Sequence, residues 1–222
     1  MPRLHHPAVS LTDAALGFEA AFFALRLGRR PKGTARARAL GRSLTGLFAA
    51  TSVASSCGAV LHGLVPDRNS TANRVLWRVS LIAIGGAALS GWSIGARLRL
   101  PPSAASRVER VAAAEFAAYA LLAASTTLPY RIAIANYLPA AVFLALALAA
   151  QAARSDRRRG ARIGLIALAL TFVAAAVQAK SIALHPRYFD HNALYHAIQG
   201  VAIAMLFGSA RRLIDPPAYE TS

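Results

Sequence analysis

Seven stretches of apolar residues, each long enough to cross a lipid bilayer, recur along this chain and limit what it can fold into. A bilayer core about 30 Å thick is crossed by an α-helix of about 20 mostly apolar residues. Polar segments rich in Pro, Gly, Asn and Arg separate the stretches, as expected for loops. The sequence therefore predicts an all-α polytopic membrane protein, a seven-transmembrane-helix bundle over residues 10–212 with tails at 1–9 and 213–222. The expected spans are 10–27, 44–65, 74–97, 109–128, 132–152, 162–184 and 191–210.

Composition supports the membrane class and excludes others. The 222 residues are 56% hydrophobic and 15% charged, which is typical of membrane proteins. The net charge of +16 comes from arginines between the apolar stretches rather than from arginines interleaved with stacking aromatics, so nucleic acid is not an expected partner. Membrane lipids are. The single cysteine, Cys57, excludes an internal disulfide and a cysteine-rich metal site.

The positions of Lys and Arg predict the orientation. Assigning alternate loops to alternate sides places 18 of these residues on one side and 7 on the other. Short cationic loops stay in the cytoplasm, so the N-terminus is expected outside and the C-terminus in the cytoplasm. This requires an odd number of spans. We expect an integral protein of a bacterial inner (plasma) membrane.

The segment "FDHNALYHAIQG", residues 189–200, puts polar side chains at the start of the seventh span. Asn192, His196 and Gln199 are four and three residues apart, so they share one helix face. Asp190 is placed to cap the free amide groups of the first turn. Polar side chains at this depth are costly unless they face the interior of a bundle. The segment is therefore predicted to form the wall of a pocket.

Other polar residues are expected at a similar depth. Glu19 lies in the first span, His62 near the end of the second and Asn73 at the start of the third. These residues either complete the pocket, or they join helices as interfacial hydrogen-bonding groups. In the second case Glu19 would form an ion pair with Arg74 or Arg78.

This layout resembles the superfamily of alkaline ceramidases and adiponectin/progestin-type receptors, which look like seven-helix intramembrane zinc hydrolases. The resemblance implies a zinc-bound water that attacks a lipid amide or ester, with His62 and His196 at two of the family's three His positions. The match is incomplete, because Asn192 stands where the family has a second His on helix seven, and Gly58 stands where it has a Ser on helix two.

Two interpretations of the metal chemistry follow. Either zinc is held by a variant set, His62, His196 and His191 or Asp67, or the fold is kept and the zinc site is lost, since an amide is a poor zinc ligand. A catalytic zinc requires three protein ligands and an open position. His191 and His196 are five residues apart, which on a regular helix points them in different directions.

Three functions compete at this stage. The first is a metal-dependent lipid hydrolase, and the second is a non-catalytic membrane protein that binds a lipid or small ligand or serves as an accessory subunit beside a membrane-protein partner. The third is a haem protein with His62 and His196 as axial ligands.

Overall fold

The computed structural model describes residues 4–29, 33–153 and 158–214, and these residues form seven α-helices. This confirms the all-α prediction. The helices are α1 Pro7–Gly28, α2 Ala35–Gly63, α3 Thr71–Arg99, α4 Pro102–Ser125, α5 Tyr130–Ala152, α6 Arg158–Ala179 and α7 His191–Ile214. The first helix begins three residues before the predicted span, and the last ends four residues beyond it.

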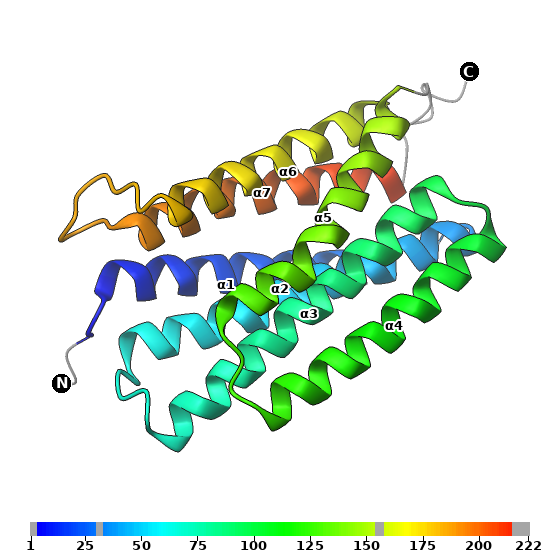
Figure 1. Ribbon diagram of the computed structural model, residues 1–222. Helices are drawn as coiled ribbons and strands as arrows, with labels where there is room; N and C mark the ends of the chain where they lie inside the picture. The colour runs from blue at the N-terminus through cyan, green and yellow to red at the C-terminus, as the bar shows by residue number, and fades with distance from the viewer. Residues whose placement is uncertain (1–3, 30–32, 154–157, 215–222) are drawn as a thin grey trace.

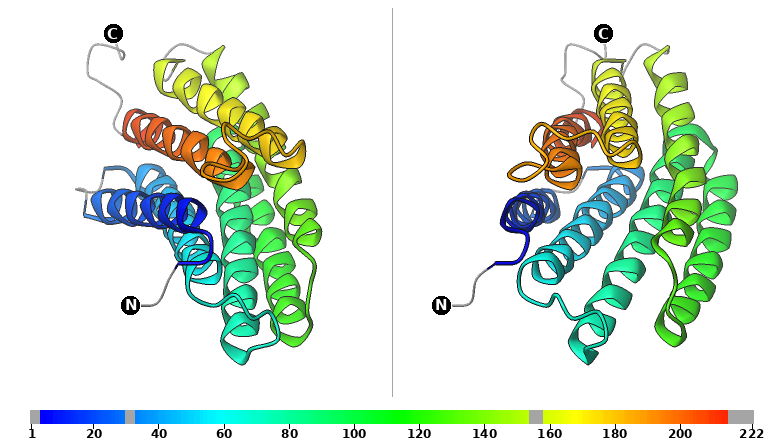
Figure 2. Two further views of the ribbon diagram at one scale, coloured as in Figure 1. Left: turned by 90° about the vertical axis from the view of Figure 1, so that its left-hand side faces the viewer. Right: turned by 60° about the vertical axis from the view of Figure 1, so that its left-hand side comes forward.

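Six of the helices pack in a closed ring, and α4 lies outside it. Around the ring the order is α1, α2, α3, α5, α6, α7 and back to α1, and α2 also touches α7. The only helix with which α4 makes substantial contact, among the described residues, is α3. Figure 1 and Figure 2 show α1 beside α7 and α4 at the edge of the bundle. Helices from the two ends of the sequence therefore close the ring.

Helix α4 differs from the others in composition as well as in place. Six helices, all except α4, are long and apolar enough to cross a membrane. Glu109, Arg110 and Glu115 lie within every 18-residue stretch of α4. Nevertheless α3 and α5 run in the same direction (Figure 1), so α4 is the segment that returns the chain between them. Its charge is partly matched locally, because Arg97 of α3 forms an ion pair with Glu109 at 2.5 Å.

The helix boundaries follow local chemistry. At α7, Asp190 Oδ1 accepts hydrogen bonds from the backbone N–H groups of Asn192 and Ala193, both at 3.0 Å. The predicted cap and the start of α7 are thus confirmed. By contrast, α6 ends at Ala179, five residues before the end of the predicted span, and the chain then turns through Ser181 with a φ of 53°. Before α1, the backbone of His5 and His6 pairs with the last turn of α2.

The interior is divided along its length. We call the end at which α1 begins the N-terminal end of the bundle (Figure 1). The half away from it contains an aromatic cluster, in which Phe23 of α1 stacks on Phe207 of α7 with ring centroids 4.3 Å apart. Phe48 of α2, fully buried, meets both rings edge-on. The polar residues considered below lie in the other half.

Candidate functional site

A histidine from α7 and two polar residues from α1 form the centre of the polar half. His196 Nε2 lies 3.2 Å from Asp13 Oδ1, and His196 Nδ1 lies 3.3 Å from Thr12 Oγ1. His196 is 8% exposed and Asp13 4%, so both side chains are shielded from the surroundings. Both nitrogens of the imidazole are therefore engaged by α1.

The hydrogen-bond geometry constrains the protons. The Thr12 hydroxyl has one hydrogen and lies 2.8 Å from the carbonyl oxygen of Ala8. While it donates there, it can only accept from His196, so Nδ1 carries a proton. Nε2 and Asp13 then share one further proton, as an imidazolium and carboxylate or as a neutral pair. In either state His196 and Asp13 satisfy each other, which a buried polar pair requires.

Helix α2 accommodates this pair through a glycine. A Cβ added at Gly58 would lie 2.5 Å from Asp13 Oδ2, closer than any real contact of that kind, so the Asp13 carboxylate rests on bare backbone. One turn away Ser10 Oγ donates to the carbonyl oxygen of Ala59 at 2.8 Å. Small residues allow helices to approach where no water drives association, and here the close approach also makes room for the carboxylate.

The polar face of α7 is used by three different neighbours. Asn192 Oδ1 accepts a hydrogen bond from Gln178 Nε2 of α6 at 3.1 Å, while His196 faces α1. Gln199 lines an internal cavity together with residues of α2, α3, α5 and α6. Asn192, His196 and Gln199 share a helix face as predicted, but each meets different surroundings: Asn192 contacts α6, His196 contacts α1 and Gln199 lines the cavity.

Among the described residues, the remaining candidates form no hydrogen bond or ion pair with His196 or Asp13. His62 is exposed in the last turn of α2, and His191 is the first residue of α7. Asn73 Nδ2 donates to the carbonyl oxygen of Val65 at 2.9 Å, which secures the loop between α2 and α3.

The predicted ion pair of Glu19 is wrong. Of the residues that the structure describes, neither Arg74 nor Arg78 forms a salt bridge with Glu19. Glu19 Oε2 instead lies against α7, where an added Cβ at Gly200 would be 3.3 Å away. The physical reason is the ring order, because α1 packs on α2 and α7 and makes no substantial contact with α3.

The donors do not fit a zinc centre. Within residues 4–29, 33–153 and 158–214, no group of three or more His, Cys, Asp or Glu side chains is arranged to hold a metal ion. The variant set His62, His191 and His196 would also need a free lone pair on His196, whose nitrogens both face α1. Axial haem ligation would need the same lone pair.

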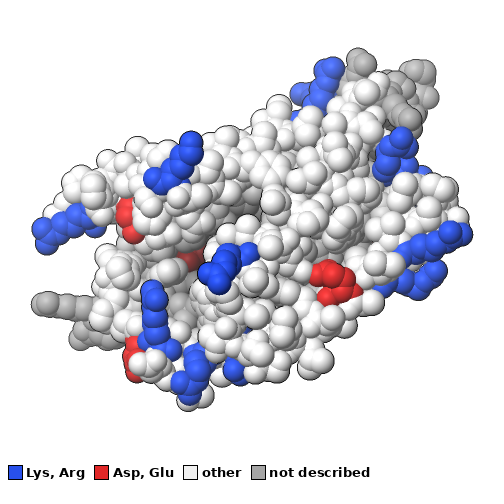
Figure 3. All heavy atoms as spheres, in the orientation of Figure 1, with Lys and Arg blue, Asp and Glu red and all other residues white. Residues whose placement is uncertain are grey.

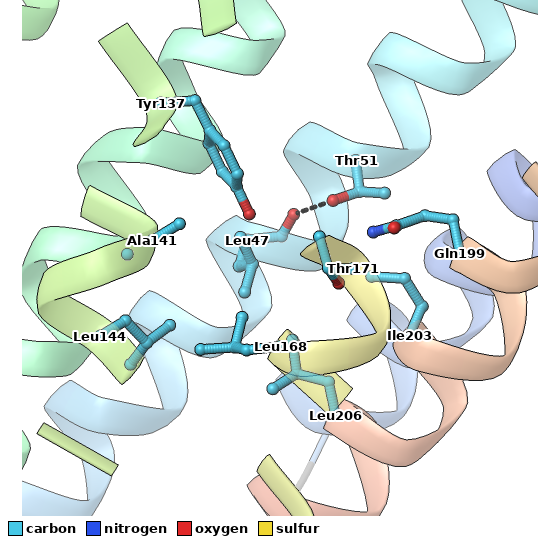
Figure 4. Close-up of a pocket in the computed structure, with 11 residues that line it drawn as sticks. Leu47, Thr51, Tyr137, Ala141, Leu144, Leu168, Thr171, Gln199, Ile203 and Leu206 are labelled. Carbon is cyan, nitrogen blue, oxygen red and sulfur yellow. Dashed lines mark hydrogen bonds between the residues drawn. The ribbon is translucent and has the colours of Figure 1, made fainter. Parts of the chain in front are cut away.

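The cavity at Gln199 has about 30 Å³ of space for water-sized molecules. In Figure 4, Tyr137, Thr171 and Gln199 direct polar atoms toward it from three helices, while Leu144, Leu168 and Leu206 lie together on its other side. A cavity of this size accommodates a water and is far too small for a porphyrin or a lipid chain.

Sequence reasoning missed the two α1 residues that contact His196. Asp13 falls inside the predicted first span, 10–27, and is ionisable, which was a signal for an interior position. Thr12 gave no signal, because threonine is common in membrane helices and usually bonds its own backbone.

Together these observations define a class of protein, an integral membrane protein built from a helical bundle with a buried polar contact. The chain belongs to DUF6962, a family of unknown function whose model matches residues 8–215. No curated protein and no solved structure gives a significant match. The family match carries no link to the alkaline ceramidases or the adiponectin/progestin-type receptors.

Proposed function

We propose that this chain is a non-catalytic membrane protein, in which the buried polar residues hold the bundle together. The observation that carries the proposal is the engagement of both His196 nitrogens by Thr12 and Asp13. A zinc ligand needs a free imidazole lone pair, and a catalytic zinc needs three such protein donors. His196 supports helix association instead.

The protein then acts through the surface of the bundle. Large apolar side chains are strongly exposed along α1 and α4, among them Phe18 at 78%, Leu121 at 71% and Val111 at 70%. Figure 3 shows Lys and Arg mostly toward the two ends of one face, with a broad surface of other residues between. Lipids cover such a surface, and a partner membrane protein would bind there if the chain is an accessory subunit.

The orientation belongs to the same proposal. The 18 to 7 distribution of Lys and Arg favours an outside N-terminus and a cytoplasmic C-terminus in a bacterial inner membrane. The His196 contact would then lie in the outer half of the bilayer. A reporter fused after Ser222 should be active in the cytoplasm, and activity only outside would overturn this orientation.

Metal analysis tests the proposal against the hydrolase alternative. Protein expressed with added zinc and purified in detergent should hold far less than one zinc per chain, and it should not hydrolyse a fluorescent ceramide. The variant N192H restores the family's helix-seven pair, and we expect it to gain no zinc because the His196 nitrogens remain engaged by α1.

The contrary result is equally specific. About one zinc per chain in the parent, as a single catalytic site requires, lost in H196A but kept in H185A, would overturn the non-catalytic proposal. His185 is a suitable control because its Nδ1 only accepts from backbone N–H groups in the loop before α7.

A further inference from the structure

The cavity at Gln199 lies inside the helix ring, where five helices meet. Its walls come from α2, α3, α5, α6 and α7. Counted from the N-terminal end of the bundle, Gln199 is eight residues into α7, which places it about 12 Å below the start of that helix. The cavity therefore lies near the middle of the bundle, away from both polar ends.

One polar atom in this cavity needs a partner. Gln199 Oε1 is buried and has no hydrogen-bond partner among the residues that the structure describes. A buried amide oxygen without a partner is rare in native structures and usually marks a site that water fills. The neighbouring hydroxyls do not meet this need, because Thr51 Oγ1 donates to the carbonyl oxygen of Leu47 at 2.9 Å and Thr171 Oγ1 donates to that of Ala167 at 3.1 Å.

The remaining capacity of the wall matches one water molecule. With their hydrogens used, Thr51 and Thr171 still offer lone pairs as acceptors, and the Tyr137 hydroxyl points into the cavity as a donor (Figure 4). A water has two hydrogens to donate and accepts in return, and a buried water typically makes about three hydrogen bonds. The space of about 30 Å³ accommodates it.

We infer that the cavity is a binding site for one ordered water, which donates to Gln199 Oε1 and to the Thr171 hydroxyl and accepts from the Tyr137 hydroxyl. This water links Gln199 of α7 to Thr171 of α6 and to Tyr137 of α5. The leucines on the other side of the cavity, Leu144, Leu168 and Leu206, give it no further polar partner.

Solid-state NMR on protein in lipid bilayers tests the site. The chain has three glutamines, Gln151, Gln178 and Gln199, so glutamine labelling gives few side-chain amide signals, and Q199M identifies the relevant one by its loss. We expect magnetisation to pass from water to the Gln199 amide in the parent protein. The double variant Y137F/T171V removes two of the water's partners and should reduce this transfer severalfold.

A matched control removes the same kinds of hydroxyl elsewhere. Tyr119 and Ser125 lie on α4, outside the ring, where their hydroxyls donate to backbone carbonyls. Y119F/S125A should therefore leave the transfer unchanged. No transfer to Gln199 in the parent, under conditions where Gln178 shows it, would mean a dry cavity and overturn the inference. Undiminished transfer in Y137F/T171V would overturn the assignment of Tyr137 and Thr171 as partners of the water. If that variant does not fold, the measurement on the parent protein decides whether the cavity holds a water.

Discussion

Helices α1 and α7 meet in two different ways along one contact. Near the N-terminal end of the bundle, Thr12 and Asp13 of α1 engage His196 of α7 through hydrogen bonds. Farther along, Phe23 of α1 stacks on Phe207 of α7 with an angle of 7° between the rings. The same pair of helices thus uses directional polar contacts in one half and ring packing in the other.

The two halves separate what each kind of contact contributes in lipid. Apolar side chains gain little from moving out of lipid into a protein interior, so the aromatic half is stabilised mainly by the fit of its rings. In the polar half a substitution costs more than the contact itself contributes, because removing one partner leaves the other buried and unsatisfied. Mutations should therefore be costlier in the polar half, and four variants test this in order of expected effect.

Replacing Asp13 by Ala should be the most destabilising change. It leaves the His196 imidazole buried without its partner, and breaking a buried pair in this way costs about 3–5 kcal/mol. The free energy of unfolding can be measured by detergent titration in mixed micelles. A double-mutant cycle with H196A should show strong coupling, and additive effects of D13A and H196A would contradict the pairing.

Gly58→Ala should come second. The new methyl group would lie 2.5 Å from Asp13 Oδ2, and overpacking of this kind costs about 1–3 kcal/mol. Gly86→Ala is the matched control, because its nearest neighbour would be the Cβ of Ala50 at an ordinary 3.6 Å. The same titration should find G86A neutral or stabilising. Equal effects of the two variants would show that α2 can move away from the carboxylate.

Asp190→Ala, also in the polar half, should lower the free energy of unfolding less than Gly58→Ala does. It removes the acceptor for two backbone N–H groups at the start of α7, and the loss of such a cap costs about 1 kcal/mol. Asp190→Asn keeps an acceptor oxygen and should retain most of the stability. Hydrogen exchange should speed up in the first turn of α7 in D190A, and unchanged exchange there would argue against the cap.

Phe207→Leu tests the aromatic half and should have a small effect, comparable to that of Asp190→Ala and well below that of Asp13→Ala. It removes the stack on Phe23 while keeping an apolar side chain, and aromatic pairs contribute about 0.5–1.5 kcal/mol beyond their buried area. Phe18→Leu is the control, since Phe18 is 78% exposed, and it should change the unfolding free energy little. A larger loss in F207L than in D13A would reverse the proposed order of the two halves.

The sequence predicted the elements better than it predicted their contacts. Seven helices and the Asp190 cap follow from local patterns, namely apolar length and residue type at a helix start. The contact between His196 and Asp13 does not, because it depends on how α1 is rotated toward α7, and periodicity leaves that rotation open where most residues are apolar. The ion pair of Glu19 with Arg74 or Arg78, one of two alternatives for that residue, is absent among the described residues for a similar reason, since the order of helices around the ring is a tertiary property.

The position of α4 has a consequence for how the protein is made. Because α3 and α5 run in the same direction, α4 returns the chain from one end of the bundle to the other, although Glu109, Arg110 and Glu115 oppose its partitioning into lipid. The helix synthesised just before it, α3, makes two polar contacts with α4. Arg97 pairs with Glu109, and the hydroxyl of Tyr119 donates to the carbonyl oxygen of Leu81 at 3.2 Å. The two helices would therefore leave the translocon as a joined hairpin rather than one at a time.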